Sequence, residues 1–97
     1  MARVSGDFPV MEKLRLMPEH ERREIIESVV VEEFRTALFM MEREEFPLDV
    51  GFFDLGLTSL RLSEVKLALE RKLDCEISTA ALFGHPTAGR LIDHLSE

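Results

Sequence analysis

Two segments with the apolar spacing of amphipathic helices, residues 18–41 and 59–73, flank a segment with one proline and two glycines, residues 44–57. Side chains that recur every three or four residues line one side of a helix, and that side must be buried against another element. The intervening segment lacks this spacing, yet it carries the large apolar side chains of Phe46, Leu48, Val50, Phe52, Phe53 and Leu55. Loops exposed for their own sake are polar, so this one is expected to lie across the core.

The first long helix is predicted to begin at Pro18 and to run to about Met41. Proline has no N–H to lose at a first helical position, and the acids that follow it complement the positive end of the helix dipole. Its inward stripe is expected to be Ile26, Val30, Phe34, Ala37, Leu38 and Met41. Residues 1–17 show little sustained periodicity and are predicted to be a leader or linker, although "VMEKLRLM" can form a short helical turn or two. Residues 18–97 then form one domain, because 97 residues can bury one modest core.

The second long helix, residues 59–73, has apolar side chains on two sides. At about 100° per residue its core side is predicted to be Leu62, Val65, Leu69 and Leu73. Leu60 and Leu67 fall nearly opposite, in the company of charged residues. Single exposed leucines are common on protein surfaces, so these two are either incidental or contacts for a partner.

Two short elements are predicted to close the chain. Ser78 caps a helical turn over residues 79–83 that ends at Gly84, and Thr87 caps a last helix that runs to about Leu95. Gly56, just before the second long helix, fits a turn that needs a positive φ. The apolar residues expected to seal the core are Leu82, Phe83, Leu91, Ile92 and Leu95. The predicted fold is all-α, a four-helix bundle of three main helices and one short helix, without a strand.

Composition argues against several classes of function. A formal charge of −7 argues against binding to nucleic acids or anionic membranes and favours partners with basic surfaces. No apolar run approaches the roughly 20 residues that span a bilayer. The single cysteine, Cys75, has no partner for a disulfide, and the chain has no zinc-ligand pattern or other metal motif, which predicts a cytoplasmic setting.

The hydroxyl of Ser59, in "FFDLGLTSLRLSEV" at residues 52–65, is the chemical group that stands out. "GLTSL" is not a nucleophile elbow, and no spacing links a histidine to this serine, so a minimal hydrolase is a weak alternative. A serine at a helix start can be an N-cap or first-turn residue with no further role. It is also exposed and reachable, so the sequence leaves open whether Ser59 is a cap or an attachment point.

The chain resembles the acyl carrier domains of modular (type I) polyketide synthases. The resemblance covers roughly residues 14–96 and rests on "PEHERREII", on "PLDVGFFDLGLTSL" and on "LFGHPTAGRLIDHL". It implies an acyl-carrier-protein-like helical bundle that is not an enzyme. It also implies that Ser59 carries 4′-phosphopantetheine from coenzyme A, on which polyketide intermediates are tethered as thioesters.

By the same resemblance, the partners are a phosphopantetheinyl transferase, a ketosynthase, an acyltransferase and tailoring enzymes, and the isolated domain is monomeric. The predicted partner contacts are Asp54, Leu57, Thr58, Leu60, Arg61, Glu64 and Leu67. Fatty-acid carriers have acids where Thr58 and Arg61 stand, and peptide carriers have paired glycines where this chain has Gly56 and Leu57, so a polyketide carrier is preferred. The alternatives are a peptidyl carrier domain of a nonribosomal peptide synthetase and a small helical interaction module without a prosthetic group.

Overall fold

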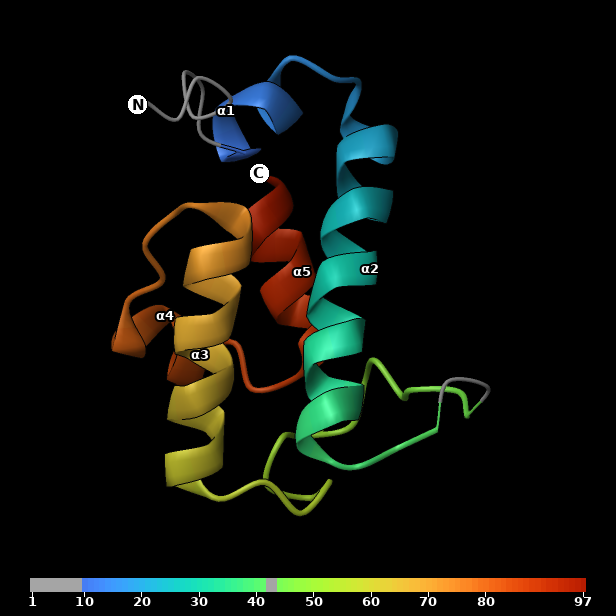
Figure 1. Cartoon of the computed structure of the whole chain (residues 1–97), viewed down its shortest axis with the longest axis vertical. Helices are drawn as coiled ribbons and strands as arrows, with labels where there is room; N and C mark the ends of the chain where they lie inside the picture. Colours follow the sequence, from blue (N-terminus) through green and yellow to red (C-terminus); the bar gives the residue numbers. More distant parts are fainter. Residues whose placement is uncertain (1–9, 42–43) are drawn as a thin grey trace, which may run out of the picture.

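Helices make up most of the structure, a computed structural model that describes residues 10–41 and 44–97. Within those residues it has five helices and no strand, which confirms the all-α prediction and adds one helix to the four expected. They are α1 (Val10–Arg15), α2 (Glu19–Ala37), α3 (Ser59–Leu73), α4 (Thr79–Gly84) and α5 (Ala88–Ser96). Figure 1 shows α2 and α3 side by side with α5 between them and α1 at the end remote from the start of α3. None of these helices combines the length and the apolar character that crossing a bilayer requires.

The additional helix, α1, lies in the predicted leader. Leu14 on α1 is buried, and Met17 packs against the same core, so this part of the leader belongs to the packed structure. Residues 1–9, the remainder of the predicted leader, lie outside the described residues. The short turn or two expected for "VMEKLRLM" is therefore confirmed.

α2 ends four residues before the predicted end at Met41. The N–H of Met40 donates to the carbonyl of Arg35 at 2.8 Å, and the N–H of Phe39 donates to that of Thr36 at 3.2 Å. This pair of bonds is a Schellman motif, which requires its left-handed residue just past the helix end. Phe39 takes that place with a φ of 58°, at a cost of about 1–2 kcal/mol relative to glycine.

The early end of α2 changes which apolar side chains reach the core. Ile26, Val30 and Phe34 are buried as predicted. Ala37 and Leu38 are partly buried against the core. Met41 is exposed, so its predicted place in the inward stripe was wrong, because the helical spacing no longer applies beyond Ala37.

α3 has the bounds and the core side that the sequence predicts. Its buried residues are Leu62, Val65, Leu69 and Leu73. Leu60 and Leu67 are 72% and 52% exposed on the other side, as expected. Lys72 forms an ion pair with Glu33, which ties α3 to α2.

The loop between α2 and α3 lies across the core. The rings of Phe52 and Phe46 stack on Phe34 of α2, with centroids 4.9 and 5.8 Å from it. The N–H of Phe52 donates to the carbonyl of Pro86 at 2.9 Å, so the loop is also fixed to the segment before α5. Gly56 has a φ of 100°, which confirms the predicted positive-φ turn.

The last two helices begin at the predicted caps. The hydroxyl of Ser78 accepts from the N–H of Ala81 at 2.9 Å, and the hydroxyl of Thr87 accepts from that of Arg90 at 3.2 Å. The core residues predicted here are Leu82, Leu91, Ile92 and Leu95, and all are buried. Phe83 was also expected to seal the core, but it is 41% exposed, because its neighbour Leu82 is the residue of α4 that fills that place.

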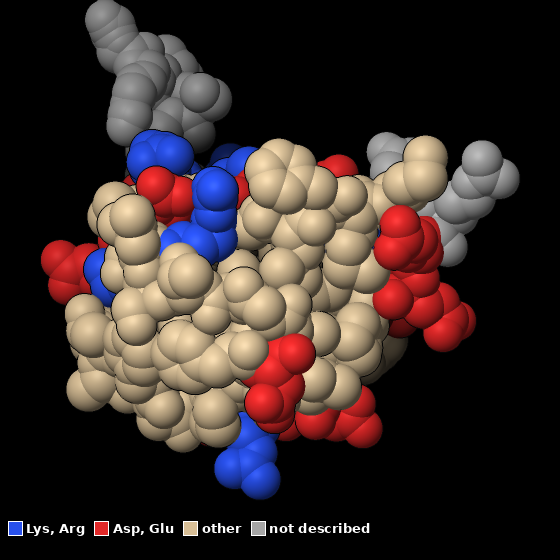
Figure 2. All heavy atoms as spheres, turned by 90° about the horizontal axis from the view of Figure 1, so that it is seen from below, with Lys and Arg blue, Asp and Glu red and all other residues tan. Residues whose placement is uncertain are grey.

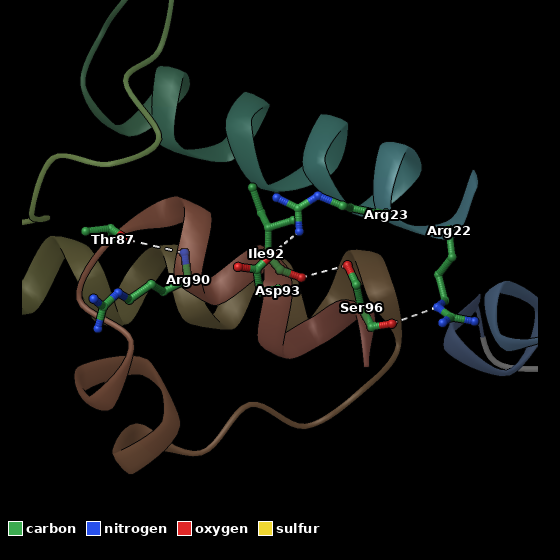
Figure 3. A network of polar contacts seen from close by, with 7 residues as sticks. All are labelled: Arg22, Arg23, Thr87, Arg90, Ile92, Asp93 and Ser96. Atoms are coloured by element: carbon green, nitrogen blue, oxygen red, sulfur yellow. Dashed lines mark hydrogen bonds and ion pairs between the residues drawn. The ribbon is translucent and has the colours of Figure 1, made fainter. Parts of the chain in front are cut away.

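Polar contacts between α2 and α5 complete the packing (Figure 3). Arg22 Nε donates to the carbonyl of Ser96 at 2.9 Å, and Arg23 forms an ion pair with Asp93. The hydroxyl of Ser96 donates to the carbonyl of Ile92 at 2.7 Å, which satisfies a buried polar group. The end of α5 is thereby fixed to the beginning of α2.

The segment after α3 is held by one carboxylate. Glu70 Oε2 accepts from the backbone N–H of Ile77 at 2.8 Å and from Lys66 Nζ at 3.3 Å. The Ile77 N–H is the main cause that lowers the pKa of Glu70 below its ordinary value; partial burial opposes it, and Lys66 adds to the lowering.

We expect Glu70→Ala to lower the free energy of unfolding at about pH 7 by about 1–2 kcal/mol, because a hydrogen bond to a charged group is lost. The pKa is lowered in the folded state, so the stabilisation by Glu70 is complete above the ordinary glutamate value and is lost as the pH falls through the folded value. Urea unfolding at about pH 7 and about pH 3 measures this: the difference between variant and wild type should shrink in acid. Glu76→Ala, at an exposed position nearby, is the matched control. An equal difference at both pH values would contradict the assignment.

Candidate functional site

Thr58, not Ser59, is the N-cap of α3. Thr58 Oγ1 accepts from the backbone N–H of Arg61 at 3.1 Å, and its φ and ψ of −91° and 165° are those of an extended cap residue. Ser59 is the first residue of the helix, and its side chain is exposed. In the part of the chain that the structure describes, its hydroxyl makes no hydrogen bond. The capping role that the sequence left open for Ser59 is therefore filled by its neighbour, and the Ser59 hydroxyl is free for chemistry.

The position of Ser59 suits a group that carries a phosphate. The first backbone N–H groups of a helix point outward without intrahelical partners, and with the helix dipole they favour an anion there. The first turn of α3 contains no acidic side chain that would oppose one. A phosphodiester on the Ser59 oxygen would thus gain roughly 0.3–1 kcal/mol from the helix end.

The segment before Ser59 is anchored on both sides of its turn. Phe52 is buried at one end, and Leu57 is 4% exposed at the other. The N–H of Leu57 donates to the carbonyl of Phe52 at 3.2 Å and closes the turn that Gly56 makes possible. Leu57 was predicted to contact partners, but its buried side chain offers no surface, so it serves as an anchor for Ser59 instead.

The other predicted contacts lie on the surface at or near the start of α3. Asp54 and Thr58 are exposed, and so is Glu64. Arg61 Nη1 contacts Glu64 Oε1 at 3.0 Å, and its guanidinium lies 5.9 Å from the centroid of the Phe39 ring. Leu60 and Leu67 lie on the same outward side of the helix.

Three exposed aromatic residues at this end were missed by reasoning from the sequence. Phe39 is 83% exposed, and Phe53 stacks on Phe83 with ring centroids 6.1 Å apart. Figure 2, which views the end of the molecule where α2 stops and α3 begins, shows it covered mostly by uncharged side chains. Each of them directly follows an apolar residue that packs in or against the core, Leu38, Phe52 or Leu82, and the sequence alone does not show which member of such a pair is exposed.

Other reactive side chains show no link to Ser59. Burial, followed by the charges of Glu70 and Asp74, raises the pKa of the Cys75 thiol, which disfavours the nucleophilic thiolate. The rings of His85 and His94 stack on each other, with their centroids 4.6 Å apart. Among the described residues there is no cluster of side chains that would hold a metal ion.

Comparison with known proteins agrees with this geometry. Residues 28–95 match the family described as phosphopantetheine attachment site (PP-binding). The spectinabilin polyketide synthase system protein NorC of Streptomyces orinoci is 27% identical over 84 residues, 87% of this chain and 4% of NorC. A phenolphthiocerol/phthiocerol polyketide synthase protein of Mycobacterium tuberculosis is 29% identical over 91 residues, 94% of this chain and 6% of that protein. The chain therefore spans 4–6% of the length of these relatives.

Solved structures share the fold. The A1-type ACP domain from module 5 of MLSA1 matches with a TM-score of 0.75 at 26% identity, over 89% of this chain and 86% of that domain. BlmI, a type-II acyl-carrier-protein from Streptomyces verticillus involved in bleomycin biosynthesis, has a TM-score of 0.70 at 22% identity, over 79% of this chain and 89% of its own. These matches confirm the predicted resemblance and the predicted fold class. The chain belongs to the phosphopantetheine attachment site family, the acyl carrier proteins that bear 4′-phosphopantetheine.

Proposed function

We propose that Ser59 is the residue of this chain to which 4′-phosphopantetheine is attached. The observation that carries the proposal is the free Ser59 hydroxyl on the first turn of α3, next to a separate capping residue. The attached group supplies a terminal thiol that holds acyl chains as thioesters. The hydroxyl of Ser59 is accessible, and the first backbone N–H groups of α3 can bind the phosphate. Phe52 and Leu57, which are buried in the loop before Ser59, hold this part of the chain in place.

We further propose that the carried chains are polyketide intermediates, presented to a ketosynthase, an acyltransferase and tailoring enzymes. The names of the relatives support this, since both are polyketide synthase proteins. The absence of acids at Thr58 and Arg61 supports it too, since fatty-acid carriers resemble this chain less at those positions. A peptidyl carrier and a helical module without a prosthetic group are the competing functions that experiments must exclude.

The domain is proposed to present the arm and not to catalyse. Ser59 has no hydrogen bond to a histidine or a carboxylate among the described residues, and an activated serine needs such a base within reach. His85 and His94 contact each other instead. A hydrolytic role would require turnover of a simple ester that Ser59→Ala abolishes.

We expect wild-type protein incubated with coenzyme A, Mg²⁺ and a broad-specificity phosphopantetheinyl transferase to gain the mass of one phosphopantetheine. Ser59→Ala should gain none and should keep the wild-type stability within about 0.5 kcal/mol, because this exposed hydroxyl caps nothing. Intact mass spectrometry and urea unfolding measure the two effects. Modification of the Ser59→Ala variant would disprove the attachment site, and Ser63→Ala, an exposed serine one turn further on, is the matched control.

Thr58→Ala should show the opposite pattern. Loss of the N-cap bond to the Arg61 N–H is expected to cost about 1 kcal/mol of stability. The mass gain should remain complete after long incubation, because the nucleophilic oxygen of Ser59 is untouched. If Thr58→Ala kept its stability while Ser59→Ala lost it, the assignment of cap and attachment residue would be reversed.

Leu60→Asp should weaken encounter with a transferase or ketosynthase while leaving helicity intact. Leu60 is 72% exposed, and an acid in the first turn is compatible with the helix dipole, so the fold should tolerate it. A tenfold loss in kcat/KM, about 1.4 kcal/mol, is the expected scale for removal of one good apolar contact. Circular dichroism checks helicity. The control is Leu16→Asp, because Leu16 is 86% exposed and directly follows α1, the helix that lies at the end remote from the start of α3 (Figure 1). Equal rates for Leu60→Asp and wild type would count against a role for this face.

A further inference from the structure

The start of α5 binds the loop that leads to Ser59. The N–H of Gly89 donates to the carbonyl of Leu48 at 2.8 Å, which places a loop oxygen on the first turn of the helix. The first N–H groups of a helix lack intrahelical partners, so this carbonyl satisfies one of them. The next N–H, that of Arg90, donates to the hydroxyl of Thr87 (Figure 3). The helix start thus binds its own cap and the loop side by side.

Glycine leaves the space that this contact needs. A Cβ atom on Gly89 would lie 2.9 Å from the carbonyl oxygen of Leu48, whereas carbon and carbonyl oxygen in weak contact are normally about 3.3–3.6 Å apart. The backbone conformation does not require glycine, because Gly89 is helical and Gly56 is the glycine with a positive φ. Alanine is also the better helix former. The contact with Leu48 therefore accounts for a glycine at this position, and the helix does not.

Two further backbone contacts join the same two segments. The three contacts form the loop seam, which pairs Leu48 with Gly89, Gly51 with Thr87, and Phe52 with Pro86. Phe52 also accepts from the N–H of Leu57, which closes the turn in front of Ser59. A displacement at the start of the loop seam can therefore reach the beginning of α3 through the backbone.

The outer side of the loop seam is open. Leu48 and Asp49 line a hollow of about 460 Å³ there, together with Arg90 and Asp93 of α5. The side chains of Asp49, Arg90 and Asp93 are exposed. Beside Gly89 the loop thus faces a hollow, so the backbone bond to Gly89 is a main restraint on this part of the loop.

We propose that Gly89 is a positioning residue for the reaction at Ser59, because its lack of a side chain lets the start of α5 hold the loop that presents the serine. The proposal rests on the attachment at Ser59 proposed above. Gly89 acts through Leu48 and the loop seam, and not on the serine oxygen directly.

Gly89→Ala tests this role, because its methyl group must displace the Leu48 carbonyl by roughly half an ångström. Misplacement by about 1 Å can cost about 10²-fold in rate, so kcat for phosphopantetheine transfer to Ser59 should fall about tenfold. KM should stay close to that of wild type, because the exposed side chains of α3 are unchanged. Rates are measured with coenzyme A and a broad-specificity transferase, at a temperature at which circular dichroism shows every variant folded. The matched control is Gly84→Ala, which should keep the wild-type kcat, since a Cβ on Gly84 would meet no atom within 4 Å.

Hydrogen exchange of backbone amides, followed by NMR, gives a readout that a loss of global stability would not imitate. In Gly89→Ala the N–H groups of Phe52 and Leu57 should exchange about tenfold faster, because one hydrogen bond of the loop seam is lost. The N–H of Leu69, in the buried middle of α3, should exchange as in wild type. In wild type the N–H of Gly89 should be protected as well as that of Phe52. This last comparison decides the matter if Gly89→Ala does not fold, since a freely exchanging Gly89 N–H would overturn the proposal.

The outcomes separate this proposal from the one on which it rests. Equal kcat in Gly89→Ala and Gly84→Ala would overturn the positioning role while leaving the attachment at Ser59 intact. Exchange that rises as much at Leu69 as at Phe52 would show a global loss of stability and would also overturn it. Absence of any modification of wild-type protein would instead disprove the attachment itself.

Discussion

The stacking of Phe52 on Phe34 is the contact on which the geometry at Ser59 depends. It joins the loop to α2 with ring centroids 4.9 Å apart and an angle of 11° between the rings, and pairs of this kind contribute about 0.5–1.5 kcal/mol beyond their burial. The backbone of Phe52 also donates to Pro86 and accepts from Leu57. Phe52 thus links α2, the segment before α5 and the residues that precede α3. The exposed serine is therefore held in place by contacts in the core as well as by its capping neighbour Thr58.

This dependence explains why so much of the fold could be predicted from the sequence and where prediction failed. The helix at 59–73 was correct at both ends because four buried residues at helical spacing and a hydroxyl residue at its start all indicate the same element. The end of the first long helix was misplaced because a phenylalanine, Phe39, occupies the left-handed position that usually reveals itself as glycine. Phe83 was misassigned because one apolar residue suffices to fill the core from a helix as short as α4, and periodicity cannot tell which of two neighbours it is.

The parts of the candidate site that depend on residues close together in the sequence were predicted. Ser59 and the outward pair of leucines follow from helix geometry and from the resemblance to carrier domains. Leu57 was misread because its burial depends on a turn closed by its bond to Phe52, and Phe52 is placed by contacts with Phe34 and Pro86, which a linear pattern does not record. The contact between Phe39 and Arg61 joins residues 22 positions apart, so neither residue alone indicates it. The sequence pattern therefore does not predict the part of the surface that combines residues from α3 and from the segment after α2.

The end around Ser59 is mostly uncharged (Figure 2), so its exposed apolar side chains favour association between copies of the chain. A contiguous apolar surface promotes association, and this end carries exposed aromatic and leucine side chains from the segment between α2 and α3, from α3 and from α4. A formal charge of −7 makes two copies of the chain repel each other at long range, which opposes pairing through that end. An enzyme with a less acidic surface meets no such repulsion and gains the same apolar contact. The acidic balance of the chain thus opposes pairing of its copies, and the exposed apolar side chains around Ser59 suit a surface that is less acidic than the chain itself.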